Sequence, residues 1–200
     1  MHMSAPMCAY PAMEAIFSLE APEHTAVVVL ADKEEIGSDG NTGLASSFFR
    51  YFVEDLADMQ GVKARHVLTR SDCLSADVTA AFDPTFPQVY DKTNTSFVNH
   101  GVSIAKYTGS RGKGGASDAN AEFLGKVRAI LDNADVHWQI GEMGKVDEGG
   151  GGTVAHFLAN LDINVLDLGV PVLSMHAPFE LVAKADVYST YRACDAFFKS

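Results

Sequence analysis

Short apolar, β-branched runs alternate with segments of helical period along this chain. The clearest run, Ala26-Val-Val-Val-Leu-Ala31, has the length and composition of a strand in a sheet that is covered on both faces. Strands are predicted at residues 25–31, 73–78, 102–107, 136–140 and 163–168. Strands that alternate with helices are typical of an α/β fold, here with a mostly parallel or mixed central sheet.

Helical patterns fill the intervals between these strands. Helices are predicted over residues 10–19 and 42–59, after the glycine-rich segment 109–115, over 153–161 and around 187–198. The first is predicted to begin at Pro11, because proline is tolerated in a first helical turn. Ser117 or Asp118 is predicted to cap the third. Gly169–Pro171 predicts a bend after the last strand, since proline breaks a central ladder.

Composition restricts the class of protein and its partners. The 200 residues suit one domain, and 47% hydrophobic with 20% charged residues is typical of a soluble globular protein. A net charge of −11 argues against nucleic acid as a partner. Three widely spaced cysteines give neither a disulfide framework nor a zinc-binding CxxC pair, so we expect a reducing cytoplasm. The sequence predicts no membrane span and no signal peptide. We interpret residues 1–7 as a tag remnant.

Four acidic or imidazole side chains follow predicted strands: Glu34, Glu35, Asp77 and His176. The carboxyl ends of parallel strands meet at one edge of a sheet, where ligands usually bind. Together these oxygen and nitrogen donors suit zinc, cobalt or manganese. Adjacent glutamates point in different directions, so one can bind a metal while the other handles a proton, as amide hydrolysis requires. The alternatives are a solvated turn for the glutamates, a turn residue for Asp77 and a structural hydrogen bond for His176.

Two glycine clusters also have candidate roles. Residues 109–117 resemble a phosphate loop, but Lys113 is followed by Gly114 and the spacing fails the GxxxxGK[ST] pattern, which excludes that site. Residues 149–152 precede a predicted helix, where backbone amides can hold a carboxylate or an oxyanion. A turn that needs glycine explains the second cluster equally well. No HExxH or GxSxG motif occurs in the chain.

Four ordered motifs carry a more specific resemblance. They are Asp32-Lys-Glu-Glu-Ile-Gly-Ser38, Ser75-Ala-Asp77, Tyr107-Thr-Gly-Ser-Arg-Gly-Lys-Gly-Gly-Ala-Ser-Asp118 and Ser174-Met-His-Ala-Pro178. From about Cys8 to Phe198 the chain resembles the aspartyl aminopeptidase and vacuolar aminopeptidase I family of dinuclear zinc aminopeptidases, particularly its bacterial branch. The resemblance implies a three-layer α/β sandwich, a homo-oligomer and a peptide substrate with a free N-terminus.

The resemblance also implies a role for each matching residue. Glu34 would be the general base, Glu35 a ligand of one zinc, Asp77 a ligand of the other and His176 a further ligand. Substrate contacts are implied, on weaker grounds, for Lys106 and for Gly150, Gly151 and Gly152.

One departure from the family concerns the ligand set. Family members are much longer and carry an upstream histidine ligand and a bridging aspartate. Here only His2 precedes Cys8, and no aspartate precedes Asp32. We therefore expect residues 8–200 to form a partial catalytic domain without its N-terminal strands, which self-associates and binds zinc incompletely. The alternative is a non-catalytic assembly or binding protein on the same scaffold. A separate polypeptide that supplies the missing half is a third possibility.

Overall fold

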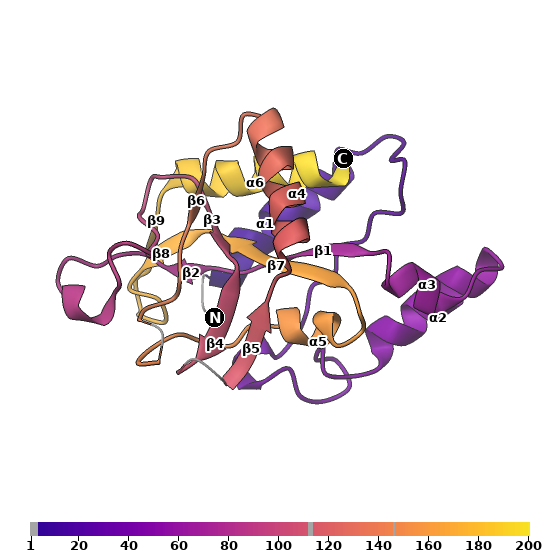
Figure 1. Cartoon of the computed structure of the whole chain (residues 1–200), viewed down its shortest axis with the longest axis horizontal. Helices are drawn as coiled ribbons and strands as arrows, with labels where there is room; N and C mark the ends of the chain where they lie inside the picture. The colour runs from indigo at the N-terminus through magenta and orange to yellow at the C-terminus, as the bar shows by residue number, and fades with distance from the viewer. Residues whose placement is uncertain (1–3, 112–113, 146) are drawn as a thin grey trace.

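A mixed four-stranded sheet forms the centre of the molecule (Figure 1). The computed structural model describes residues 4–111, 114–145 and 147–200. The sheet contains β1 (Asp72–Ala76), β7 (Asn164–Gly169), β3 (Val102–Ala105) and β6 (Trp138–Ile140), in that spatial order. β1 and β7 are parallel, as are β3 and β6, whereas β3 and β7 run antiparallel. The predicted α/β fold with a mixed sheet is confirmed.

Helices cover both faces of this sheet (Figure 1). α1 (Ser4–Phe17), α4 (Ala121–Asn133) and α6 (Lys184–Phe198) lie on one face, and α5 (Ala155–Ala159) lies on the other. Strand alternation explains how β7 serves both layers. Leu166 and Leu168 pack in the core with α4 and α6, while Val165 packs with α5. The result is the expected three-layer arrangement.

The remaining elements extend this framework. α2 (Phe48–Met59) and α3 (Ala64–Leu68) project at one end (Figure 1). A second sheet contains β2 (Thr79–Ala80), β8 (Pro171–Leu173) and β9 (Leu181–Val182). A hairpin pairs β4 (Tyr107–Ser110) with β5 (Gly114–Asp118), and two 3-10 helices span Glu34–Ile36 (η1) and Pro87–Val89 (η2). The chain passes from the first sheet to the second at residue 77 and at residue 170, which confirms the predicted bend.

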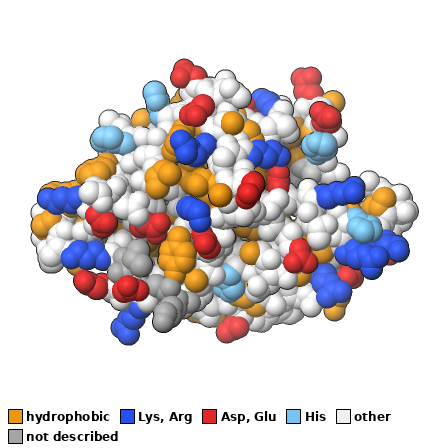
Figure 2. All heavy atoms as spheres, viewed as in Figure 1, with side chains coloured by type: hydrophobic (Ala, Val, Ile, Leu, Met, Phe, Trp, Pro, Cys, Tyr) orange, Lys and Arg blue, Asp and Glu red, His pale blue; other side chains and the backbone are white. Residues whose placement is uncertain are grey.

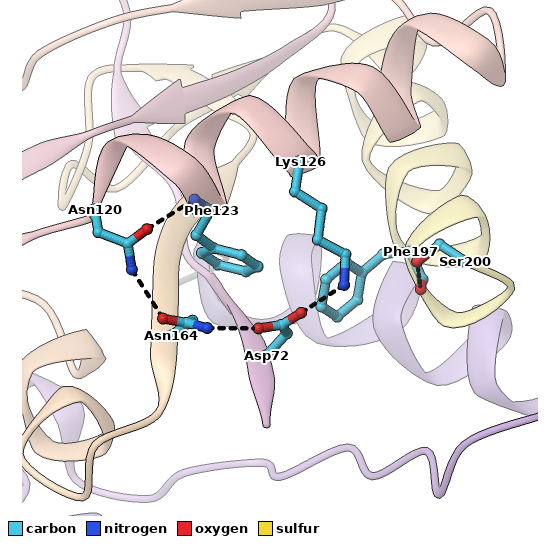
Figure 3. Close-up of polar contacts among 7 residues, drawn as sticks. All are labelled: Asp72, Asn120, Phe123, Lys126, Asn164, Phe197 and Ser200. Atoms are coloured by element: carbon cyan, nitrogen blue, oxygen red, sulfur yellow. Dashed lines mark hydrogen bonds and ion pairs between the residues drawn. The ribbon is translucent and has the colours of Figure 1, made fainter. Parts of the chain in front are cut away.

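A polar chain fastens α4 to the starts of β1 and β7 (Figure 3). Asn120 caps α4, where its side chain accepts the Phe123 N–H at 2.7 Å, and it donates to Asn164 at 2.8 Å. Asn164 in turn donates to Asp72, its register partner, and Lys126 of α4 pairs with the same carboxylate at 2.7 Å. These contacts fix the helix at the end of the sheet where β1 and β7 begin.

Residues 25–31 do not form the predicted strand. The segment is extended, and no described residue forms a ladder with it or a backbone hydrogen bond to it. The side chains of Val27, Val29 and Leu30 are 38%, 46% and 58% exposed. β-Branched residues favour an extended backbone, but a strand also needs a neighbour that satisfies its N–H and C=O groups. The described part of the chain supplies no such neighbour.

Three helix boundaries also differ from the prediction. α1 begins at Ser4 and carries Pro11 in its interior, because Cys8, Pro11 and Ala15 are buried by packing that outweighs the cost of the proline. α2 begins only at Phe48, after a series of turns. Asn120 caps α4 because residues 117 and 118 belong to β5.

Within the described ranges, no helix has the length and apolar character that crossing a bilayer requires.

Candidate functional site

The two glutamates lie in a sharply folded turn. η1 places Glu34 and Glu35 between Lys33 and Gly37, both of which have left-handed backbones with φ of 61° and 89°. Gly43 packs closely against the end of this turn, since a Cβ at that position would lie 1.9 Å from the Ser38 carbonyl oxygen. The glycine-rich sequence therefore folds the chain back on itself and presents the glutamates at its tip.

Asp77 occupies the crossing between the two sheets. Its N–H donates to the Leu168 carbonyl at 3.2 Å, and its Oδ1 accepts the Val78 N–H at 2.7 Å. The neighbouring strand must carry glycine here, because a Cβ on Gly169 would lie 1.4 Å from the Asp77 carbonyl oxygen. Close backbone approach to Gly169 thus fixes the position of Asp77.

His176 lies in the loop between β8 and β9 and contacts Glu35. Its Nε2 is 3.2 Å from Glu35 Oε1, and both side chains are about half exposed, at 52% and 51%. The two residues are 141 positions apart in sequence, and the fold brings them together. This contact brings η1 and the β8–β9 loop side by side.

The electrostatics show that Glu34 and Asp77 belong to the same cluster. Burial raises the pKa of Glu34, the negative charges of Asp77 and Glu35 raise it further, and His176 opposes them. Burial likewise raises the pKa of Asp77 to about 6, with added contributions from Asp167 and Glu35, against the Val78 hydrogen bond and His176. Several carboxylates that repel one another at one site favour a bound cation or proton.

The donor set can be compared with the needs of zinc. Two zinc ligands at tetrahedral positions lie about 3.3 Å apart, given zinc–donor distances of about 2.0–2.1 Å. The separation of 3.2 Å between His176 Nε2 and Glu35 Oε1 is that of a direct hydrogen bond, and it also matches two donors that share one ion. Among the described residues, however, no three His, Cys, Asp or Glu side chains are arranged as a complete metal site. The described residues thus hold a fitting ligand pair with further carboxylates nearby.

A buried carboxylate beneath the site, Asp167, escaped the sequence predictions. It lies on β7 opposite Ser75 of β1 and is 7% exposed. Burial raises its pKa to about 6, although the hydroxyls of Ser75, Thr153 and Thr108 act in the opposite direction. Its Oδ1 forms no hydrogen bond of normal geometry with any described residue. A charged residue within the apolar run 163–168 was the available sequence signal.

The residues predicted to contact substrate lie around the β4–β5 hairpin. Lys106 forms an ion pair with Asp118. Gly150 has φ of 87°, and a Cβ there would lie 2.3 Å from the Gly109 carbonyl oxygen. Gly150 and Gly151 line a small hollow with Tyr107 and Glu142, and Gly152 packs close to Gly115. The glycine loop therefore packs against the hairpin. This close packing requires glycine independently of any role of the loop in binding substrate.

Comparison with known proteins identifies the family of this chain. The model of the family described as aminopeptidase I zinc metalloprotease (M18) matches residues 3–198. A probable M18 family aminopeptidase 1 from Clostridium acetobutylicum is 45% identical over 198 residues, which cover 97% of this chain and 43% of the relative. The crystal structure of an M18 family aminopeptidase from Thermotoga maritima matches with a TM-score of 0.92 at 42% identity, over 96% of this chain and 44% of that one.

A more distant structure, the S. cerevisiae mApe1 dodecamer, matches with a TM-score of 0.82 at 25% identity, over 98% of this chain and 44% of that one. The chain thus spans less than half the length of these relatives. It belongs to the M18 family of aminopeptidase I zinc metalloproteases.

Proposed function

We propose that this chain supplies part of the active site of a zinc-dependent aminopeptidase, which hydrolyses the N-terminal bond of a peptide. One observation carries the proposal. Glu34, Glu35, Asp77 and His176 come from three distant parts of the sequence and meet in one electrostatic cluster on an M18 scaffold.

Glu35 and His176 would hold one zinc ion, because their donor atoms already have the separation that a shared ion requires. Asp77 would bind a second zinc, as a carboxylate whose burial and negative neighbours favour a cation. When bound, zinc supplies Lewis acidity, which activates water and polarises a carbonyl group. Cobalt and manganese accept the same donors.

Glu34 has the properties of a general base beside that metal. It is half-buried, and its raised pKa brings proton uptake and release closer to neutral pH. Lys106 and the backbone of Gly150, Gly151 and Gly152 are proposed to contact the peptide. The Lys106 ammonium would have to leave Asp118 or share it with the substrate. The backbone N–H groups of the three glycines are the donors that would take part.

A non-catalytic assembly or binding protein on this scaffold is the second candidate. It is favoured by the lack of a three-donor set among the described residues. In either case we propose a cytoplasmic homo-oligomer. The oligomer is supported by the dodecameric relative and by the unpaired segment 25–31. Residues 8–200 would form the partial catalytic domain, with further ligands contributed from outside it.

The test compares the wild-type chain with Glu34→Gln after dialysis against zinc. We expect the variant to keep its zinc and to hydrolyse aminoacyl-p-nitroanilides at least about 100-fold more slowly, the usual effect of removing a general base. Unchanged turnover would refute the role of Glu34. Zinc binding by a wild-type chain that shows no turnover would favour the non-catalytic candidate, and turnover that appears only with a second polypeptide would show that the site is shared.

A further inference from the structure

The loop that carries His176 has a backbone that needs support. Residues 174–180 join β8 to β9, whose antiparallel pairing fixes both ends of the loop. Within it, Ser174 and His176 have left-handed backbones, with φ of 58° and 65°. Residues with a Cβ disfavour this region, and they remain in it only where surrounding contacts hold them.

Two hydrogen bonds between described residues lie within this loop. The Ala177 N–H donates to the Ser174 carbonyl at 2.9 Å. The His176 N–H donates to Glu180 Oε1 at 2.7 Å. Glu180 is the last residue before β9, so its own backbone is anchored by the strand. A carboxylate that accepts a backbone N–H at this distance forms a strong, charge-assisted hydrogen bond.

This contact involves the backbone from which the imidazole projects. The backbone conformation of His176 sets the direction of its Cα–Cβ bond, and that direction places Nε2 3.2 Å from Glu35 Oε1. If φ returned to the negative region, the ring would swing away from η1. We propose that Glu180 is a positioning residue, which holds His176 beside Glu35 by accepting its main-chain N–H. The consequence for zinc binding rests on the proposed function, whereas the hydrogen bond itself does not.

Two variants separate this role from a general effect of charge. Glu180→Gln keeps a side-chain oxygen that can accept the N–H, and Glu180→Ala keeps none. Phe179→Ala is a matched control in the same loop, because the Phe179 side chain is 89% exposed. Glu180→Gln therefore removes the charge alone, Glu180→Ala removes the charge and the acceptor, and Phe179→Ala removes neither.

The first measurement is hydrogen exchange of the His176 amide by NMR in the metal-free chain. The second is zinc affinity, by competition with a chromophoric chelator. In Glu180→Ala we expect the amide to exchange about tenfold faster, as a local hydrogen bond is lost. We expect zinc to bind about tenfold more weakly, the usual scale for loss of a group that orients a ligand. Glu180→Gln and Phe179→Ala should stay close to wild type in both.

Equal amide exchange in Glu180→Ala and Glu180→Gln would refute the hydrogen bond. An equal loss of zinc affinity in both variants would assign the effect to charge and overturn the positioning role. If the wild-type chain bound no zinc, the metal site of the proposed function would fail and the positioning role toward zinc with it. The exchange comparison would still show whether Glu180 holds the loop.

Discussion

At the residue scale, a close backbone approach at Gly169 determines where Asp77 lies. Gly169 allows the Asp77 backbone to pass, with a hypothetical Cβ only 1.4 Å from the Asp77 carbonyl oxygen. We expect Gly169→Ala to destabilise the fold by about 3 kcal/mol or more, because rigid backbone must move. Gly125 in α4 is the control, since a Cβ there meets no atom within 4 Å. Gly125→Ala should stabilise the fold by about 0.5–1 kcal/mol. Urea unfolding measures both.

Asp167 gives the molecule a characteristic dependence on pH. The pKa of its carboxyl is raised from 3.8 to about 6 in the fold, so the folded state holds the proton more tightly than the unfolded chain does. Its ionisation therefore costs stability as the pH rises from about 4 to about 6, and the cost levels off at about 3 kcal/mol. Below pH 4 the carboxyl is protonated in both states and the cost vanishes.

Asp167→Asn removes this titration. We expect the stability of the variant relative to wild type to rise by about 3 kcal/mol between pH 4 and pH 7, measured by urea unfolding of the metal-free chain. Carboxyls that do not face Asp167 titrate alike in both proteins and cancel in the difference. Asp77 is the exception, because Asp167 helps to raise its pKa, and relief of that repulsion adds to the difference in the same direction. A difference that stays constant over this interval would show that Asp167 is solvated like a surface residue.

At the scale of elements, the sequence predicted the four strands of the central sheet and the bend at Gly169–Pro171, but not the second sheet or the β4–β5 hairpin. Apolar residues that recur every two or every 3.6 positions identify strands and helices with many packing partners, such as β7 and α4. Residues 25–31 were mispredicted because propensity describes the backbone a segment prefers and says nothing of its neighbours. The cap of α4 was misplaced by two or three residues, because residues 117 and 118 pair with β4 in the hairpin.

The site was predicted in part for the same reason. Residues that follow strands are visible in the sequence, and the structure brings Glu35 to His176 and places Glu34 near Asp77. Asp167 and Glu180 were missed, because the first was hidden in an apolar run and the second acts through backbone geometry. The assignment of individual roles came from the family resemblance and remains a proposal.

The unpaired segment 25–31 predicts that the chain self-associates. Its N–H and C=O groups form no backbone hydrogen bond with a described residue, and its exposed valines are uncharged, which together make a template for strand pairing. We expect the chain to self-associate at micromolar concentration in light scattering. Val29→Lys should shift it toward monomer, while Met59→Lys, which replaces an 84% exposed side chain on α2, should not. A wild-type monomer would contradict this prediction.

At the scale of the whole molecule, the net charge is −11, and acidic and basic side chains mix on the face that Figure 2 shows. The carboxylates that matter are those that the fold concentrates at one edge, where repulsion among them favours a cation. This edge is formed by the two sheets, by the crossing at Asp77 and by the β8–β9 loop. Binding of zinc is therefore the property that links the fold to the proposed function.

Zinc stoichiometry of the wild-type chain and of His176→Ala, after dialysis against zinc and removal of free metal, tests this link most directly. We expect about one zinc per wild-type chain, since Glu35 and His176 fit a shared ion, and at least about tenfold weaker binding in the variant. Absence of bound zinc, or binding that is indifferent to His176, would contradict the account.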